Sequence, residues 1–156
     1  MKKTELIIRS NSSDIDFALL KDGRLIELNK ETSDNKFSVG DIFLAKIGKV
    51  LTGLNASFVN VGYPKDGFLH YHDLGPQVQS LNKFIKTVST GKHKDFTLKN
   101  FRFEKDINKG GSINDVLKTG QNLLVQIVKE PISTKGPRIS SELSIAGRFL
   151  VLVPFS

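Results

Sequence analysis

Residues 55–74, NASFVNVGYPKDGFLHYHDL, contain two strand-like segments that are joined by a short turn. In the first segment β-branched valines alternate with Phe58, and the valines are the better core residues. In the second segment Leu69 alternates with Phe68, and we expect the leucine to face the core. The pattern therefore predicts two phenylalanines on the exposed face of neighbouring strands.

Exposed aromatic rings on a basic β-sheet are typical of proteins that bind single-stranded nucleic acid, because bases stack on the rings. Lysines nearby would attract the phosphates. The alternative is that both phenylalanines are core residues and that the faces are reversed, since phenylalanine is usually buried. The spacing alone leaves both interpretations open.

The surrounding sequence predicts an all-β unit, because segments with strand-like apolar patterns follow one another across short turns. Strands are expected within residues 42–51, 56–62, 68–74 and 122–130, and one or two more within residues 138–154. Within residues 42–51, Lys46 lies on the face opposite Ala45 and Ile47. Lys46 is therefore expected on the exposed side of its strand.

A second group of strands precedes this unit. Residues 4–9, 15–20 and 24–28 are predicted to form a small antiparallel meander, since Asp22-Gly23 is a strong hairpin signal. A meander of this size is not stable alone, so it must pack on something.

Residues 75–120 interrupt the pattern of strands. A short helix is expected at residues 77–86, and a helical turn at residues 112–117 whose start Ser or Asn can cap. Residues 82–111 carry eight basic and three acidic side chains, a net charge of +5, with interleaved phenylalanines. This basic segment could contact RNA, a partner protein or a membrane, or it could be a solvated loop.

Composition limits the class of protein. The chain has 156 residues, a net charge of +7 and a pI near 9.6, which favours a polyanionic partner over the alternative of a generically basic protein. The absence of cysteine excludes disulfides and cysteine-ligated metal sites. No apolar run approaches a membrane span or a signal peptide, so we expect a cytoplasmic location and no membrane partner.

No catalytic or metal site is predicted in the chain. His70 and His72 would need carboxylates such as Asp73 to hold zinc, and ordinary surface histidines are the favoured interpretation. Asp14 and Asp16 are expected to be surface charges rather than magnesium ligands. No nucleotide-binding motif of the Walker A or GxGxxG type is present.

Two stretches resemble the bacterial ribonuclease E/G family. They are GDIFLAKIGKVLTGLNASFVNVGYPKDGFLHYHDL, residues 40–74, and DVLKTGQNLLVQIVKEPISTKGPRISSELSIAGRFLVLVP, residues 115–154. The K-G loop followed by SIAG and LVLVP is specific, because S1 domains in general lack it. The resemblance implies a mainly β fold with an S1-like OB-fold, a five-stranded antiparallel barrel, preceded by the small meander and carrying a basic, partly helical insertion.

The resemblance also implies the domain organisation. Residues 1–36 are expected to be the opening strands of a split RNase H-like subdomain. Residues 37–145 are the S1-like RNA-binding domain, with the insertion at residues 76–120. Residues 146–156 would begin a following 5′-sensor region, and the abrupt end after a strand leads us to expect a truncated chain.

In this family the S1-like domain guides single-stranded RNA to a nuclease centre formed elsewhere. Its RNA-contacting phenylalanines fall on Phe58 and Phe68, and the lysine of its K-G loop falls on Lys135. Apart from the resemblance, the sequence of residues 133–138 predicts a turn with two cations that suits a phosphate. The alternative is that Lys135 is a solvated loop lysine. The complete set of expected RNA-binding residues is Phe58, Phe68, Lys135, Lys46, His70 and Arg138.

The family resemblance implies a parent protein that cleaves RNA in processing and decay, including rRNA processing and mRNA decay. Such a parent is a magnesium-dependent, homo-oligomeric endoribonuclease with structural zinc. The acidic and cysteine residues for these metals would lie beyond this chain, so we expect it to bind RNA as a monomer without cleaving it. The alternative is a standalone S1-type OB-fold protein of the translation apparatus, against which the N-terminal meander argues.

Overall fold

A computed structural model describes residues 3–32, 37–91 and 98–155. The chain divides into two compact units, Met1–Lys36 and Phe37–Ser156. Both are dominated by strands, so the predicted mainly β fold class is confirmed. Residues 33–36, the last four residues of the first predicted domain, lie outside the described residues.

The first unit is an antiparallel sheet of β1 (Thr4–Ser10), β2 (Asp14–Lys21) and β3 (Arg24–Thr32). Asp22 and Gly23 form the β2–β3 turn with positive φ angles of 51° and 75°, as a tight hairpin requires. Lys30 lies 2.9 Å from Asp14; this contact lowers the pKa of Asp14 and raises the pKa of Lys30. The predicted meander is confirmed.

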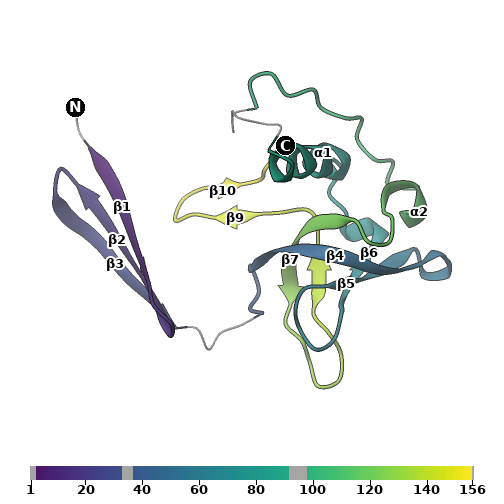
Figure 1. Cartoon of the computed structure of the whole chain (residues 1–156), viewed down its shortest axis with the longest axis horizontal. Coiled ribbons are helices and arrows are strands. Elements are labelled where there is room, and N and C mark those ends of the chain that lie inside the picture. Colours follow the sequence, from purple (N-terminus) through teal and green to yellow (C-terminus); the bar gives the residue numbers. More distant parts are fainter. Residues whose placement is uncertain (1–2, 33–36, 92–97, 156) are drawn as a thin grey trace. The chain divides into compact units, whose positions relative to one another are not determined.

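The second unit contains a barrel (Figure 1). Among the described residues its strands are β4 (Ile42–Leu51), β5 (Ala56–Asn60), β6 (Gly67–His70), β7 (Asn122–Lys129) and β8 (Arg138–Ser140). They close in the order β4-β5-β6-β8-β7, so the prediction of a five-stranded barrel is confirmed.

One detail of the predicted barrel differs. β6 and β8 pair in parallel, with Phe68 opposite Arg138, whereas the barrel was expected to be antiparallel throughout. Strand direction cannot alternate all the way around a closed ring with an odd number of strands. At least one neighbouring pair must therefore be parallel, and in this barrel it is β6 with β8.

The faces of the strands follow the predicted alternation. Val59 and Leu69 are fully buried in the barrel core, together with Ile47 on β4. Phe58 is 37% exposed, and Phe68 is half-buried. The valines and the leucine therefore form the core, and the alternative with reversed faces is wrong.

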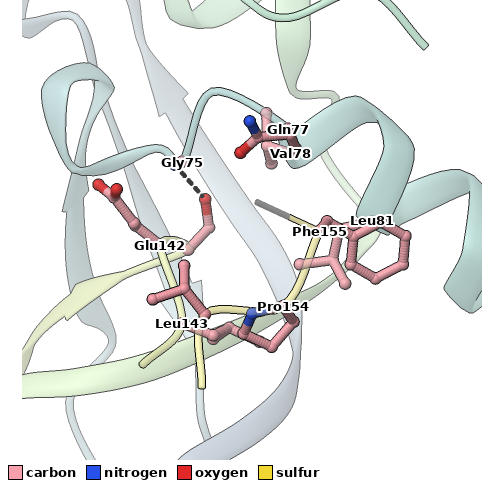
Figure 2. Close-up of a pocket in the computed structure, with 10 residues that line it drawn as sticks. Gly75, Gln77, Val78, Leu81, Glu142, Leu143, Pro154 and Phe155 are labelled. Atoms are coloured by element: carbon pink, nitrogen blue, oxygen red, sulfur yellow. Dashed lines mark hydrogen bonds between the residues drawn. The ribbon is translucent and has the colours of Figure 1, made fainter. Parts of the chain in front are cut away.

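The helix α1 (Val78–Ser89) follows the short 3₁₀ turn η2 (Tyr71–Asp73), close to the predicted helix at residues 77–86. Figure 2 shows Leu81 of α1 beside Phe155. The Gly75 N–H donates a hydrogen bond of 3.1 Å to the Ser141 hydroxyl. The cavity among these residues holds about 20 Å³, enough for one water molecule. It is a feature of packing rather than a ligand site.

The phenylalanines of the basic segment pack on one another. Phe101 lies 5.8 Å from Phe84 of α1 and 5.3 Å from Phe103, measured between ring centroids, and Phe155 contacts all three rings. Phe96 and its neighbours, residues 92–97, lie outside the described residues. These ring contacts hold Phe101 and Phe103, from the later part of the basic segment, close to α1.

The predicted helical turn is α2 (Ile113–Val116), but its cap comes from elsewhere. The Ser112 side chain makes no capping hydrogen bond. Instead the Ile113 N–H donates to Asn55 Oδ1 at 2.7 Å, and Asn55 Nδ2 donates to the Gly111 carbonyl. Asn55 follows the 3₁₀ turn η1 (Thr52–Leu54) with φ 47°, a conformation that asparagine tolerates.

Residues 138–154 form more strands than the one or two expected. After β8, a hairpin of β9 (Ile145–Ala146) and β10 (Val151–Leu152) follows (Figure 1). No helix in the described part of the chain is long and apolar enough to cross a membrane.

Candidate nucleic-acid interface

Phe58 and Phe68 face each other across the β5–β6 pair. They are direct cross-strand partners, their ring centroids lie 6.0 Å apart, and the ring planes meet at 67°. This edge-to-face arrangement is a favourable one for aromatic pairs. The two rings therefore make one aromatic surface on the outside of the barrel.

Glycines bring the β7–β8 loop against this surface. The Phe68 N–H donates to the Pro137 carbonyl at 2.9 Å. A Cβ on Gly67 would lie 3.1 Å from Ile139 Cδ1, and a Cβ on Gly136 would overlap the Asp66 carbonyl oxygen. Only glycine at position 136 lets the loop approach the β5–β6 turn so closely, and this approach places Lys135 near the rings.

The rings and the loop enclose an open depression of about 610 Å³, which we call the aromatic depression. Its lining is Phe58, Lys65, Asp66, Phe68, Thr134, Lys135, Gly136 and Arg138. Four of the six predicted residues, both phenylalanines, Lys135 and Arg138, thus meet at one place. They come from strands and a loop that are separated by up to 80 residues of sequence.

Lys65 is a lining residue that the sequence analysis did not name. It lies in the turn YPKDG immediately before Phe68. This position next to a predicted RNA-contacting ring is a sequence signal that could have identified Lys65 as a candidate. Among the described residues, neither Lys65 nor Lys135 has an ion-pair partner. Both lysines therefore keep their positive charge available to an anion.

Arg138 differs from these lysines, because Asp73 holds it. Its Nη2 lies 3.0 Å from both Asp73 carboxylate oxygens, and its Nε lies 3.2 Å from Oδ2. The pKa of Arg138 is raised, mainly by the hydrogen bonds to Asp73 and secondly by the negative charge of that carboxylate. The ion pair orients the guanidinium and offsets part of its charge.

Lys46 and His70 lie outside the lining of the depression. Lys46 is exposed on β4, opposite Asn60 on one side and Asn122 on the other. His70 shares the outer face of β6 with Phe68, and its Nδ1 accepts the His72 N–H at 3.2 Å. The two residues flank the aromatic surface.

The described residues contain no group of three or more His, Cys, Asp or Glu side chains placed to hold a metal. Asp73, the carboxylate nearest in sequence to the two histidines, is engaged by Arg138. The arrangement can stack planar groups on Phe58 and Phe68 and attract anions to Lys65 and Lys135.

Comparison with known proteins connects the chain to two named groups of relatives. It is 30% identical over 150 residues to ribonuclease G of Escherichia coli, covering 96% of this chain and 27% of the relative. It is 29% identical to ribonuclease G of Haemophilus influenzae, covering 99% and 28%, and 34% identical to ribonuclease E of Synechocystis, covering 75% and 14%. No family model matches the chain.

These matches include most of this chain and a small part of each relative. The chain spans about a quarter of the length of the ribonuclease G proteins, 27% and 28% of those two, and less of the ribonuclease E protein. The similarity therefore covers both described units of this chain.

Proposed function

Because this chain belongs to the ribonuclease E/G family, we propose that it binds single-stranded RNA and guides it to the nuclease centre of an RNase E/G-type endoribonuclease. The aromatic depression is the observation that carries this proposal, since it combines two partly exposed rings with lysines on one barrel face. Bases would stack on Phe58 and Phe68, and phosphates would lie against Lys65 and Lys135.

The parent protein would cleave RNA in cytoplasmic RNA processing and decay, as a homo-oligomer. Magnesium at the nuclease centre and structural zinc belong to that parent in this proposal. We expect the 156-residue chain alone to bind RNA as a monomer and not to cleave it. The barrel by itself also suits a standalone RNA-binding protein of the translation apparatus, but the named relatives support the ribonuclease proposal.

A binding experiment tests the proposal. Fluorescence anisotropy would measure the affinity for a short single-stranded RNA at two salt concentrations, for the wild type and for the variant F58A/F68A. We expect the double variant to lose roughly 2 kcal/mol or more of binding free energy, because each stacked base contributes about 1–3 kcal/mol. Its salt dependence should stay unchanged, since the phosphate contacts remain.

Phe149→Ala provides the matched control, because Phe149 is 85% exposed and lies outside the aromatic depression. This variant should bind RNA like the wild type. Equal affinity of a folded F58A/F68A variant and the wild type would contradict the proposed stacking surface. Cleavage of the RNA by the chain alone in the presence of magnesium would contradict the division between guidance and catalysis.

A further inference from the structure

A second pocket lies between α1 and the turn before β7, with a volume of about 690 Å³, in the range of pockets that hold small ligands. We call it the α1 pocket. Its described lining consists of lysines, uncharged polar side chains and an isoleucine, without a carboxylate. This composition suits a ligand that is both anionic and capable of hydrogen bonding.

The lysines of the α1 pocket are not equivalent. Lys83 forms an ion pair with Glu104 and also donates to the Arg102 carbonyl, so its charge is largely used within the chain. Lys86 and Lys118 have no ion-pair partner among the described residues, and both are exposed. These two lysines supply the positive potential that a phosphate group would meet.

Asn82 adds an unused hydrogen-bond acceptor. Its Oδ1 atom is buried, yet it finds no donor among the described residues. A buried amide oxygen without a donor is unfavourable, and Asn82 lines the α1 pocket, so its amide is a candidate acceptor for an N–H or O–H group of a ligand. Base amino groups and the ribose 2′-hydroxyl are such donors, and RNA carries them together with phosphates.

A row of exposed polar residues joins this pocket to the aromatic surface. Asn122 lines the α1 pocket and is the cross-strand partner of Lys46, which in turn faces Asn60 on β5. Asn60 shares its strand face with Phe58, two residues away. The row crosses β7, β4 and β5, and neighbouring strands are only about 4.8 Å apart.

We propose that RNA stacked on Phe58 and Phe68 continues over Lys46 into the α1 pocket. There a nucleotide places its phosphates against Lys86 and Lys118 and a donor group against Asn82. This inference rests on the proposed function and extends it by a second contact on the same strand of RNA. It also gives Lys46, which lies outside the aromatic depression, a place on the path.

The test compares single-stranded RNAs of about 4 and about 12 nucleotides, a short and a longer length within the usual range of OB-fold site sizes of about 4 to 16 nucleotides. Anisotropy would be measured with the whole chain for the wild type, for K86A/K118A, and for K21A/K105A. The last variant changes the charge equally with lysines that line neither pocket. Circular dichroism would verify that each variant is folded.

We expect K86A/K118A to bind the short RNA like the wild type and the long RNA more weakly than K21A/K105A does. Because K86A/K118A would lose two phosphate contacts, its affinity for the long RNA should depend less on the salt concentration. Between about 50 and 200 mM salt, the wild type should lose about sevenfold more affinity than the variant. Asn82→Ala should also bind the long RNA more weakly than the wild type, because the variant lacks the amide acceptor for the donor group of the nucleotide.

Equal affinities of K86A/K118A and K21A/K105A for the long RNA would overturn this inference while leaving the proposed function intact. An absence of RNA binding at both lengths would overturn both. F58A/F68A could lose binding of the short RNA while K86A/K118A keeps wild-type binding of the long RNA. This result would show that RNA binds only at the aromatic depression, and it would overturn the inference.

Discussion

Phe58 and Phe68 illustrate what one residue's position on a strand decides. Alternation along β5 and β6 places both rings on the outer face, and pairing in register places them opposite each other. The charges around them are less predictable. Arg138 lies 65 residues from Asp73 in the sequence, and only the barrel brings the two together.

The Asp73–Arg138 pair yields a prediction at this scale. In Asp73→Asn the guanidinium loses its anionic partner, so it becomes available to a phosphate at the edge of the aromatic depression. We expect tighter RNA binding at low salt. The plot of log affinity against log salt should become steeper by about 0.7, which is one added phosphate contact.

Glu142→Gln is the control for this variant, since it removes the charge of an exposed carboxylate that does not line the depression. It should leave the slope of the salt dependence unchanged. A slope for Asp73→Asn equal to that of the control would show that Arg138 does not reach the RNA.

At the scale of elements, the contact between the β7–β8 loop and the β5–β6 turn positions the candidate interface. Gly136 packs directly on the Asp66 backbone, and the Phe68 N–H bonds to Pro137. A sequence pattern can indicate that a K-G loop is present. It does not indicate which turn the loop packs against, because that contact depends on how the barrel closes.

Gly136→Ala should therefore disturb the loop. The added methyl group would overlap the Asp66 carbonyl, and such overpacking typically costs about 1–3 kcal/mol of folding free energy. RNA affinity should fall as well, because Lys135 is displaced from the rings. Urea unfolding and anisotropy measure the two effects.

Gly53→Ala is a matched control, since a Cβ at this position meets no atom within 4 Å. Its stability should stay within about 0.5 kcal/mol of the wild type. If Gly136→Ala were as stable as Gly53→Ala and bound RNA equally well, the close approach would not position Lys135.

At the scale of the whole molecule, the two units differ in how they bury apolar side chains. In the barrel unit, Val59, Leu123 and Val125 are fully buried. In the first unit, Leu6, Ile8 and Leu28 are 60%, 58% and 64% exposed, so little apolar surface holds that sheet together. Local stability follows such burial.

We accordingly expect unequal hydrogen exchange in the intact chain. Amides of β1, β2 and β3 should exchange much faster than those of β4, β5 and β7, because sheets with few buried contacts open more readily. Mass spectrometry of exchanged peptides would measure this. Equal protection of both units would mean that the apolar side chains of the first sheet are covered in solution.

The sequence by itself indicated the barrel strands and the N-terminal meander, and it favoured an outward position for Phe58 and Phe68 that the structure then confirmed. These features depend on local turn residues and on a side-chain period of two, which adjacent residues reveal. Only the tertiary structure decided the parallel β6–β8 pair, the capping of α2 by Asn55, the pairing of Arg138 with Asp73 and the approach of Lys135 to the rings. Each of these contacts joins segments that are far apart in the sequence, so it depends on how the chain folds and no local pattern encodes it.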